Sequence, residues 1–143
     1  MKRYIFLLPL VAIAVFSCNG KANPVKPDNH IPELIREWVN SFEEEIDSIS
    51  IYRPSDYKQF PAARYRDGFS LQSDGTCRYM VLSPDDGHYS VAGTWSVSVP
   101  GDTIVEIRDS VGCIHYILKV IALRSDVLRV IKLGVDFINA EES

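Results

Sequence analysis

The side chains that could carry out chemistry are few and scattered along the chain. The 143 residues include three histidines, His30, His88 and His115, and none stands at metal-ligand spacing from a second histidine or a cysteine. The sequence contains no Cys-x-x-Cys pair, His-Glu-x-x-His zinc motif, phosphate-binding glycine loop or serine nucleophile elbow. It therefore predicts no catalytic residue, no metal site and no cofactor.

Two of the remaining polar groups have a structural and a functional interpretation. Asp85 and Asp86 are adjacent in a Pro-Asp-Asp-Gly segment, where they are better explained as turn formers than as an acid/base pair. A glycosidase-like pair of carboxylates from separated strands stays open, because such pairs are not adjacent in sequence. His115 lies beside Cys113 on an expected strand, and a rim or surface position is favoured over a place in a cavity.

Residues 52–69 combine arginines with aromatic side chains and contain only two acidic residues, Asp56 and Asp67. Arginine and aromatic residues are enriched where binding energy is concentrated. The segment is therefore a candidate binding surface for an anionic ligand, a glycan or a partner protein. The alternative is a connector whose aromatic side chains pack on the domain while its arginines stay solvated. The candidate surface residues are Arg53, Tyr57, Arg64, Tyr65 and Arg66.

An apolar stripe before this segment predicts one amphipathic helix over residues 32–47. Pro32 suits its first turn, and Pro54 prevents it from continuing past Arg53. Its apolar side is expected to pack against a sheet. The alternative is a helix that binds a partner or lies on a membrane, and its acidic polar side argues against the membrane. The stripe recurs at steps of three and four residues and consists of Ile31, Leu34, Ile35, Trp38, Val39, Phe42, Ile46 and Ile49.

The rest of the chain is typical of short antiparallel strands joined by turns. Alternation on the segments around Trp95 and Tyr116 indicates half-buried strands, and strand spacing of roughly 8–12 residues favours a sandwich or a barrel. A last edge piece is expected at Phe137 and Ile138. The expected strands cover residues 66–72, 77–82, 89–99, 103–108, 113–122 and 127–133.

Three short segments resemble the small lipocalin-like domains of bacterial lipoproteins: Gly93-Thr94-Trp95, Gly101-Asp102-Thr103-Ile104 and Asp126-Val127-Leu128. The resemblance covers about residues 66–133. It implies an antiparallel up-and-down β-barrel or half-open barrel, so that with the helix the expected class is mainly β, of the α+β type. Trp95 and Tyr116 are expected to line the barrel, around a small ligand or in a barrel filled by side chains.

The first residues have the features of an export signal. Lys2 and Arg3 precede an apolar stretch over residues 4–16 that is too short to span a hydrocarbon core of about 30 Å as a helix. A charged start, a short apolar segment and a small residue at its end predict a secretory signal peptide over residues 1–17.

The end of this segment, Val15-Phe16-Ser17-Cys18, resembles the lipobox of bacterial lipoproteins. The resemblance implies lipidation of Cys18, cleavage before it, and a stable anchor made of several acyl chains. A secreted protein without lipid is the alternative. Residues 18–29 read as the lipidated cysteine with a semi-extended tether, and residues 30–143 as the folded domain. In the lipoproteins that this segment resembles, an acidic run after the cysteine often marks transport to the cell surface. No such run follows Cys18, so the resemblance implies the periplasmic face of the outer membrane.

Lipidation of Cys18 would leave two cysteines, Cys77 and Cys113. An even count in an oxidising compartment suggests a disulfide. Their positions on strands that are not neighbours in a meander oppose it, because a bridge needs Cα atoms within about 7 Å. Two half-buried thiols that pack as small hydrophobic side chains are the alternative.

Composition and the absence of chemical motifs leave three functional hypotheses. The net charge of −4 disfavours general nucleic-acid binding. The leading hypothesis is a membrane-anchored, non-enzymatic protein of the cell envelope that holds a small apolar or amphipathic ligand in its barrel. The alternative is a structural, assembly or protein-interaction partner with a side-chain-filled barrel. An envelope hydrolase is the least favoured.

Overall fold

The structure is a computed structural model that describes residues 31–85, 87–98 and 103–134. The expected signal peptide, Cys18, the tether, His30, Asp86 and the edge piece at Phe137 and Ile138 lie outside the described residues. Within the described ranges, no helix is long and apolar enough to cross a bilayer.

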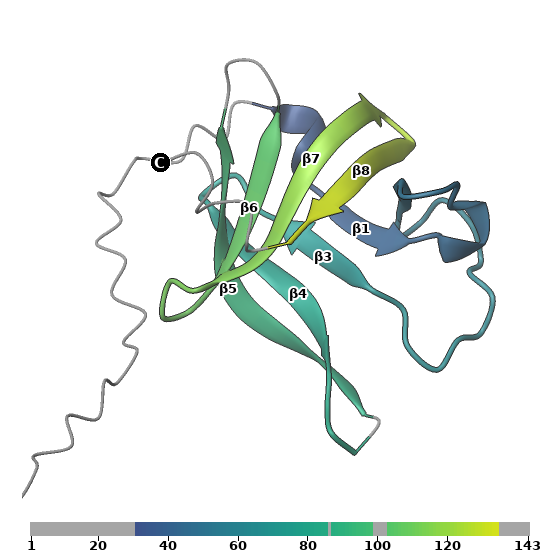
Figure 1. Cartoon of the computed structure of the whole chain (residues 1–143), viewed down its shortest axis with the longest axis horizontal. Coiled ribbons are helices and arrows are strands. Elements are labelled where there is room, and N and C mark those ends of the chain that lie inside the picture. Colours follow the sequence, from purple (N-terminus) through teal and green to yellow (C-terminus); the bar gives the residue numbers. More distant parts are fainter. Residues whose placement is uncertain (1–30, 86, 99–102, 135–143) are drawn as a thin grey trace, which may run out of the picture.

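Eight antiparallel strands close into a barrel (Figure 1). The prediction of a mainly β protein built on a barrel is confirmed, and the barrel is closed rather than half-open. The strands are β1 (Glu37–Asn40), β2 (Ser50–Pro54), β3 (Gly68–Leu71), β4 (Thr76–Leu82), β5 (His88–Ser98), β6 (Ile104–Asp109), β7 (Ile114–Arg124) and β8 (Val127–Leu133).

The strand order departs from a simple up-and-down barrel at one place. Strands β3 to β8 are neighbours in sequence order, but β1 lies between β2 and β3, and β2 pairs with β8 to close the barrel. Since β2 and β3 are both antiparallel to β1, they run in the same direction. The connector over residues 55–67 must therefore return along the length of the barrel before β3 begins.

The prediction of an amphipathic helix over residues 32–47, and with it the α+β class, is wrong. The described part of the chain has only two single-turn 3₁₀-helices there, η1 (Pro32–Leu34) and η2 (Phe42–Glu44), with β1 between them. Strand β1 pairs with β2 on one side and β3 on the other, and these ladders replace the hydrogen bonds of a helix.

Large side chains fill the barrel. Those of Trp38, Tyr52, Trp95, Ile107 and Leu118 are between 0 and 2% exposed. Leu34 of η1 is fully buried in the same core, and the Trp38 Nε1 donates a hydrogen bond to its carbonyl oxygen at 3.0 Å. The interior thus resembles a packed protein core, in which few voids exceed the size of a water molecule.

Gly93 of the Gly-x-Trp segment permits a close approach between strands. A Cβ atom at this position would lie 2.1 Å from the carbonyl oxygen of Arg108 on β6 and 3.0 Å from the ring of Tyr79 on β4. Glycine is therefore required here by space. Two residues further on, the Trp95 Nε1 donates to the Gln72 carbonyl at 2.8 Å, which satisfies the polar atom of a buried indole.

Candidate functional site

A buried carboxylate, Asp67, lies immediately before β3 and collects hydrogen bonds from three strands. Its Oδ2 accepts from the Tyr52 hydroxyl on β2 at 2.6 Å and from the Lys132 Nζ on β8 at 2.7 Å, and its Oδ1 accepts from the Tyr116 hydroxyl on β7 at 2.9 Å. Asp67 is 7% exposed, and Tyr52 is fully buried. We call these four residues the Asp67 cluster.

Charge and hydrogen bonding fix the protonation of this cluster. Burial by itself would raise the pKa of Asp67, but the Lys132 ammonium and the hydrogen bonds from Lys132, Tyr52 and Tyr116 outweigh it and hold the pKa below its usual value. Burial, together with the Asp67 charge, raises the pKa of both Tyr52 and Tyr116. At neutral pH the carboxylate is therefore ionised and both tyrosines are protonated.

The Asp67 cluster is suited to holding the fold rather than to catalysis. Both carboxylate oxygens already accept hydrogen bonds, so Asp67 has no exposed basic oxygen to offer a substrate. His115 lies beside the cluster in an exposed position, where its ring stacks on Tyr79 with centroids 4.3 Å apart. Asp67 was named from the sequence only as one of two acidic residues in a basic segment, and no partner was predicted for it. Its partners come from three separate strands, which no local pattern links.

The arginines of the predicted binding surface are occupied by partners within the chain. Arg53 forms ion pairs with Glu44 at 2.8 Å and Asp126 at 3.2 Å, and its guanidinium lies 4.3 Å from the ring centroid of Tyr57. The hydrogen bond from Arg53 is the largest of several contributions that lower the pKa of Glu44 to about 2. These contacts hold Arg53 and Glu44 in fixed positions.

Arg66 is occupied in the same way. Its Nη1 donates to the Asn40 carbonyl at 2.8 Å and pairs with Glu43 at 2.9 Å, while the guanidinium lies 4.4 Å from the ring centroid of Phe42. Lys58 donates to the Ser41 hydroxyl at 2.8 Å. Together with Arg53, these residues clamp the loop after β1 to the connector over residues 55–67.

Two further residues of that candidate surface lie elsewhere on the connector. The Tyr65 hydroxyl donates to the Met80 carbonyl at 3.1 Å, and Arg64 is exposed. The structure therefore brings Arg53, Tyr57 and Arg66 into a clamp and leaves Arg64 and Tyr65 outside it. Of the two interpretations, the connector that packs on the domain fits better, although Arg53 and Arg66 are ion-paired rather than solvated.

The other candidate residues are far from any common site. No disulfide joins Cys77 to Cys113, because Cys77 is buried on β4 and Cys113 precedes β7, with β5 and β6 between them. Burial raises the pKa of the Cys77 thiol to about 11. Asp85 accepts a hydrogen bond from Ser83 in the turn after β4, and His88 is exposed at the start of β5. Trp95 is buried in the core, and Tyr116 packs against it.

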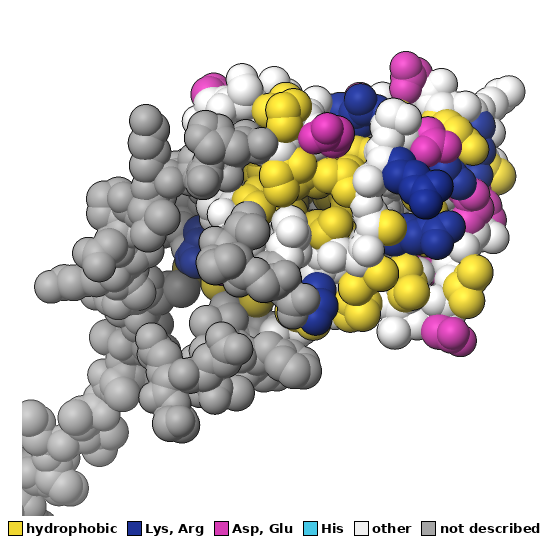
Figure 2. Space-filling view, turned by 90° about the horizontal axis from the view of Figure 1, so that it is seen from above, with side chains coloured by type: hydrophobic (Ala, Val, Ile, Leu, Met, Phe, Trp, Pro, Cys, Tyr) yellow, Lys and Arg dark blue, Asp and Glu magenta, His cyan; other side chains and the backbone are white. Residues whose placement is uncertain are grey.

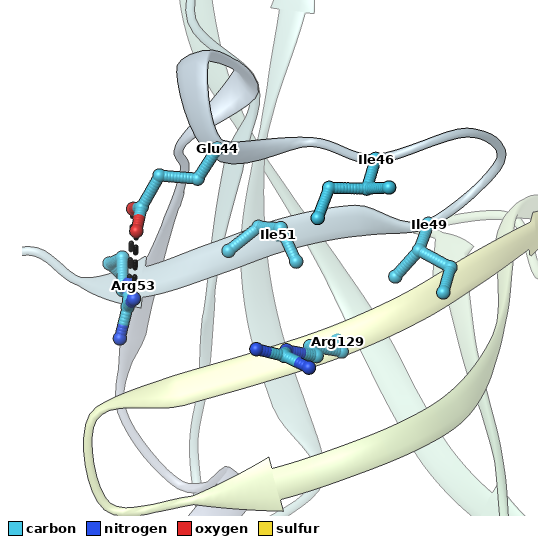
Figure 3. Close-up of a pocket in the computed structure, with 6 residues that line it drawn as sticks. All are labelled: Glu44, Ile46, Ile49, Ile51, Arg53 and Arg129. Atoms are coloured by element: carbon cyan, nitrogen blue, oxygen red, sulfur yellow. Dashed lines mark hydrogen bonds and ion pairs between the residues drawn. The ribbon is translucent and has the colours of Figure 1, made fainter.

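A hollow on the outside of the barrel was not predicted. It lies between the loop after η2 and strand β8, and the space in and above it, open solvent included, is about 350 Å³ (Figure 3). The apolar floor comes from Ile46, Ile49 and Ile51; Ile51 is 5% exposed, whereas Ile46 is 67% exposed. The ion pair between Arg53 and Glu44 lines one side. We call this site the outer hollow.

Sequence reasoning missed the outer hollow because it placed Ile46 and Ile49 on one side of a helix. In the structure these two residues form an isolated bridge with each other and fold over the outer face of β2. The only local signal was that three isoleucines occur within six residues, which is equally typical of a core element.

Arg129 completes the outer hollow on β8, where it is the cross-strand neighbour of Ile51. Its side chain is exposed and, among the residues that the structure describes, forms no hydrogen bond or ion pair. Arg36 and Arg53 both donate to carbonyls of the β7–β8 turn, at Ser125 and Asp126. Figure 2 shows cationic side chains gathered toward the right of the view, with apolar and acidic ones beside them.

No group of three or more His, Cys, Asp or Glu side chains within the described ranges is arranged to hold a metal ion. Comparisons with protein-family models, with curated proteins and with solved structures find no match to this chain.

Proposed function

We propose that this chain is a lipid-anchored, non-enzymatic protein of the bacterial cell envelope that acts through the outer surface of its barrel on a partner protein. The observation that carries the proposal is the filled interior. Trp38, Tyr52 and Trp95 occupy the barrel with 2% exposure or less, and a small-molecule carrier needs that space for its ligand.

The barrel in this proposal is a scaffold that holds a surface rigid. Its core and the Asp67 cluster join β2, β7 and β8, while the clamp around Arg53 and Arg66 fixes the loop that lines the outer hollow. A site supported in this way loses little conformational freedom when a partner binds. The hypothesis of a ligand held inside the barrel loses support from the same packing.

The proposal of an envelope address is supported by the charged and apolar segment before Cys18 and by its resemblance to a lipobox. Metabolic labelling with a palmitate analogue tests it, followed by fractionation of membranes. We expect label in the native chain and none in the Cys18→Ser variant, which should move to the soluble fraction. Equal labelling of both chains would overturn the lipid anchor at Cys18.

The choice of the outer surface is tested by photo-crosslinking in living cells, with a photoreactive amino acid at Ile46 and, as a matched control, at Tyr89. Both side chains are more than half exposed, but Tyr89 lies on β5, away from the outer hollow. We expect a discrete protein adduct from position 46 that disappears when Arg129 is changed to Gln, and none from position 89. Adducts of equal yield from both positions would contradict a partner at this surface.

A further inference from the structure

We propose that the outer hollow is a docking site for a protein segment in which an apolar side chain stands next to a carboxylate. The apolar side chain would enter between Ile46, Ile49 and Ile51, and the carboxylate would pair with Arg129. This inference rests on the proposed function, because it specifies the chemistry of the partner that the surface would recognise.

The evidence for the apolar half of the site is that one of its isoleucines, Ile46, is exposed to water. Ile46 is two thirds exposed on a loop that folds back over Ile51, and Figure 3 shows Ile46, Ile49 and Ile51 turned toward one space. An aliphatic or aromatic side chain seated there would remove apolar surface from water on both partners, which is the principal driving force of association.

The evidence for the charged half of the site is that one of its two arginines has ion-pair partners and the other has none within the part of the chain that the structure describes. Arg53 is committed to Glu44 and Asp126, whereas Arg129 has no ion-pair partner among the described residues. Glu44 does not repel an incoming carboxylate strongly, because Arg53 and Lys58 offset its charge at 2.8 and 3.2 Å. Arg129 is therefore the group at which an anionic side chain gains a new bidentate partner.

The dimensions favour one side chain over a whole small molecule. The outer hollow is open, and its empty volume of about 350 Å³ includes space that is continuous with solvent. Sites that hold small molecules bury most of the ligand surface, which an open hollow on the outside of a barrel does not do. A side chain delivered by a larger surface needs only a shallow recess, since the surrounding contacts exclude water.

Methyl NMR tests the site directly, because isoleucines line it. The full chain, reconstituted in lipid nanodiscs and labelled at isoleucine δ1 methyls, is titrated with blocked pentapeptides in which leucine stands beside aspartate, asparagine or lysine. We expect shifts confined to Ile46, Ile49 and Ile51, with a dissociation constant on the order of 1 mM for the aspartate peptide. The asparagine and lysine peptides should bind about 3- to 10-fold more weakly.

Matched variants separate the two halves of the site. Arg129→Gln should weaken binding of the aspartate peptide about 3- to 10-fold and abolish its preference over asparagine, while Arg124→Gln, with the same charge change outside the outer hollow, should do neither. Ile46→Ser should weaken all three peptides about tenfold, and Ile121→Ser, at an exposed site on β7, should weaken none.

Equal binding of the aspartate and lysine peptides, or shifts away from the three isoleucines, would overturn the inference. Failure of the proposed function has a different signature. If the peptides bind as expected but position 46 yields no adduct in cells, the site stands and the partner role fails. If the peptides do not bind but adducts form, the surface function stands and the chemistry assigned to the outer hollow fails.

Discussion

Removal of the Tyr52 hydroxyl, by Tyr52→Phe, should destabilise the barrel by about 2 kcal/mol. This hydroxyl is fully buried and donates to the Asp67 carboxylate at 2.6 Å. A hydrogen bond to a charged group contributes about 1.5–3 kcal/mol to stability. The loss should not exceed this range, because the same carboxylate oxygen still accepts from Lys132 at 2.7 Å. For a domain of this size the midpoint of thermal unfolding should fall by roughly 10 °C.

Urea unfolding followed by tryptophan fluorescence measures this change, since Trp38 and Trp95 are both buried and report on the core. The control is Tyr89→Phe, which removes a hydroxyl from a side chain that is 55% exposed on β5, and it should change stability by less than about 0.5 kcal/mol. The double variant with Asp67→Asn gives the coupling between the two groups.

Alkaline pH gives a second readout of the same bond. The pKa of Tyr52 is raised in the folded state, mainly by burial, whereas an unfolded tyrosine ionises near pH 10. The stabilising contribution is therefore complete below about pH 10 and is lost as pH rises above it. Tyr52→Phe should lose less stability than the native chain between neutral pH and pH 11. A change below 0.5 kcal/mol at neutral pH, with unchanged alkaline behaviour, would refute the role given to this hydroxyl.

The Asp67 carboxylate should make the barrel acid-sensitive. Because its pKa is lowered in the folded state, its contribution to the free energy of unfolding should fall as pH drops below about 5. Asp67→Asn should therefore make the free energy of unfolding depend less on pH in that range. Gly93→Ala should cost about 3 kcal/mol or more in chemical denaturation, because its Cβ would lie 2.1 Å from a backbone oxygen, whereas Gly134→Ala meets nothing within 4 Å and should be neutral. Arg66→Ala should cost about 1 kcal/mol and raise hydrogen exchange in the loop after β1. Cys77, with a pKa raised to about 11, should resist alkylation at pH 8 until the protein unfolds, and rapid native alkylation would contradict its burial.

The strands from β4 onward could be predicted because two local signals coincide there. Turn residues and strand spacing place residues 127–133 in a strand that matches β8, although its apolar residues do not alternate cleanly. Period-two alternation adds to these signals around Trp95 and Tyr116, and the bounds of β5 and β6 lie within one residue of the expected ones. Closure of these strands into a barrel is consistent with that pattern but also needs the pairing of β2 with β8, which local sequence does not encode.

The segment before β2 could not be predicted from periodicity. The apolar residues at helical spacing do not share one environment. Leu34 and Trp38 lie in the core, whereas Phe42 and Ile46 are exposed. The pairing of β1 with strands on both sides decided its conformation, and tertiary pairing of this kind overrides propensity.

The candidate sites could not be predicted either, because their residues come together only through the strand order. In the Asp67 cluster, Asp67 pairs with Lys132, which lies 65 positions further along the chain. The outer hollow depends on Arg129 lying across from Ile51, which follows only from the strand order. The basic and aromatic segment was predicted as a candidate binding surface, and in the structure its Arg53 and Arg66 form ion pairs with the loop after β1.

Native mass spectrometry of the protein, purified from its own membranes without denaturation, tests most directly whether the barrel is a filled scaffold. The packing of Trp38, Tyr52 and Trp95 leads us to expect only the mass of the chain with its acyl groups. A reproducible additional mass that is lost on unfolding, and that remains in the Arg129→Gln variant, would show a ligand inside the barrel and would contradict this account.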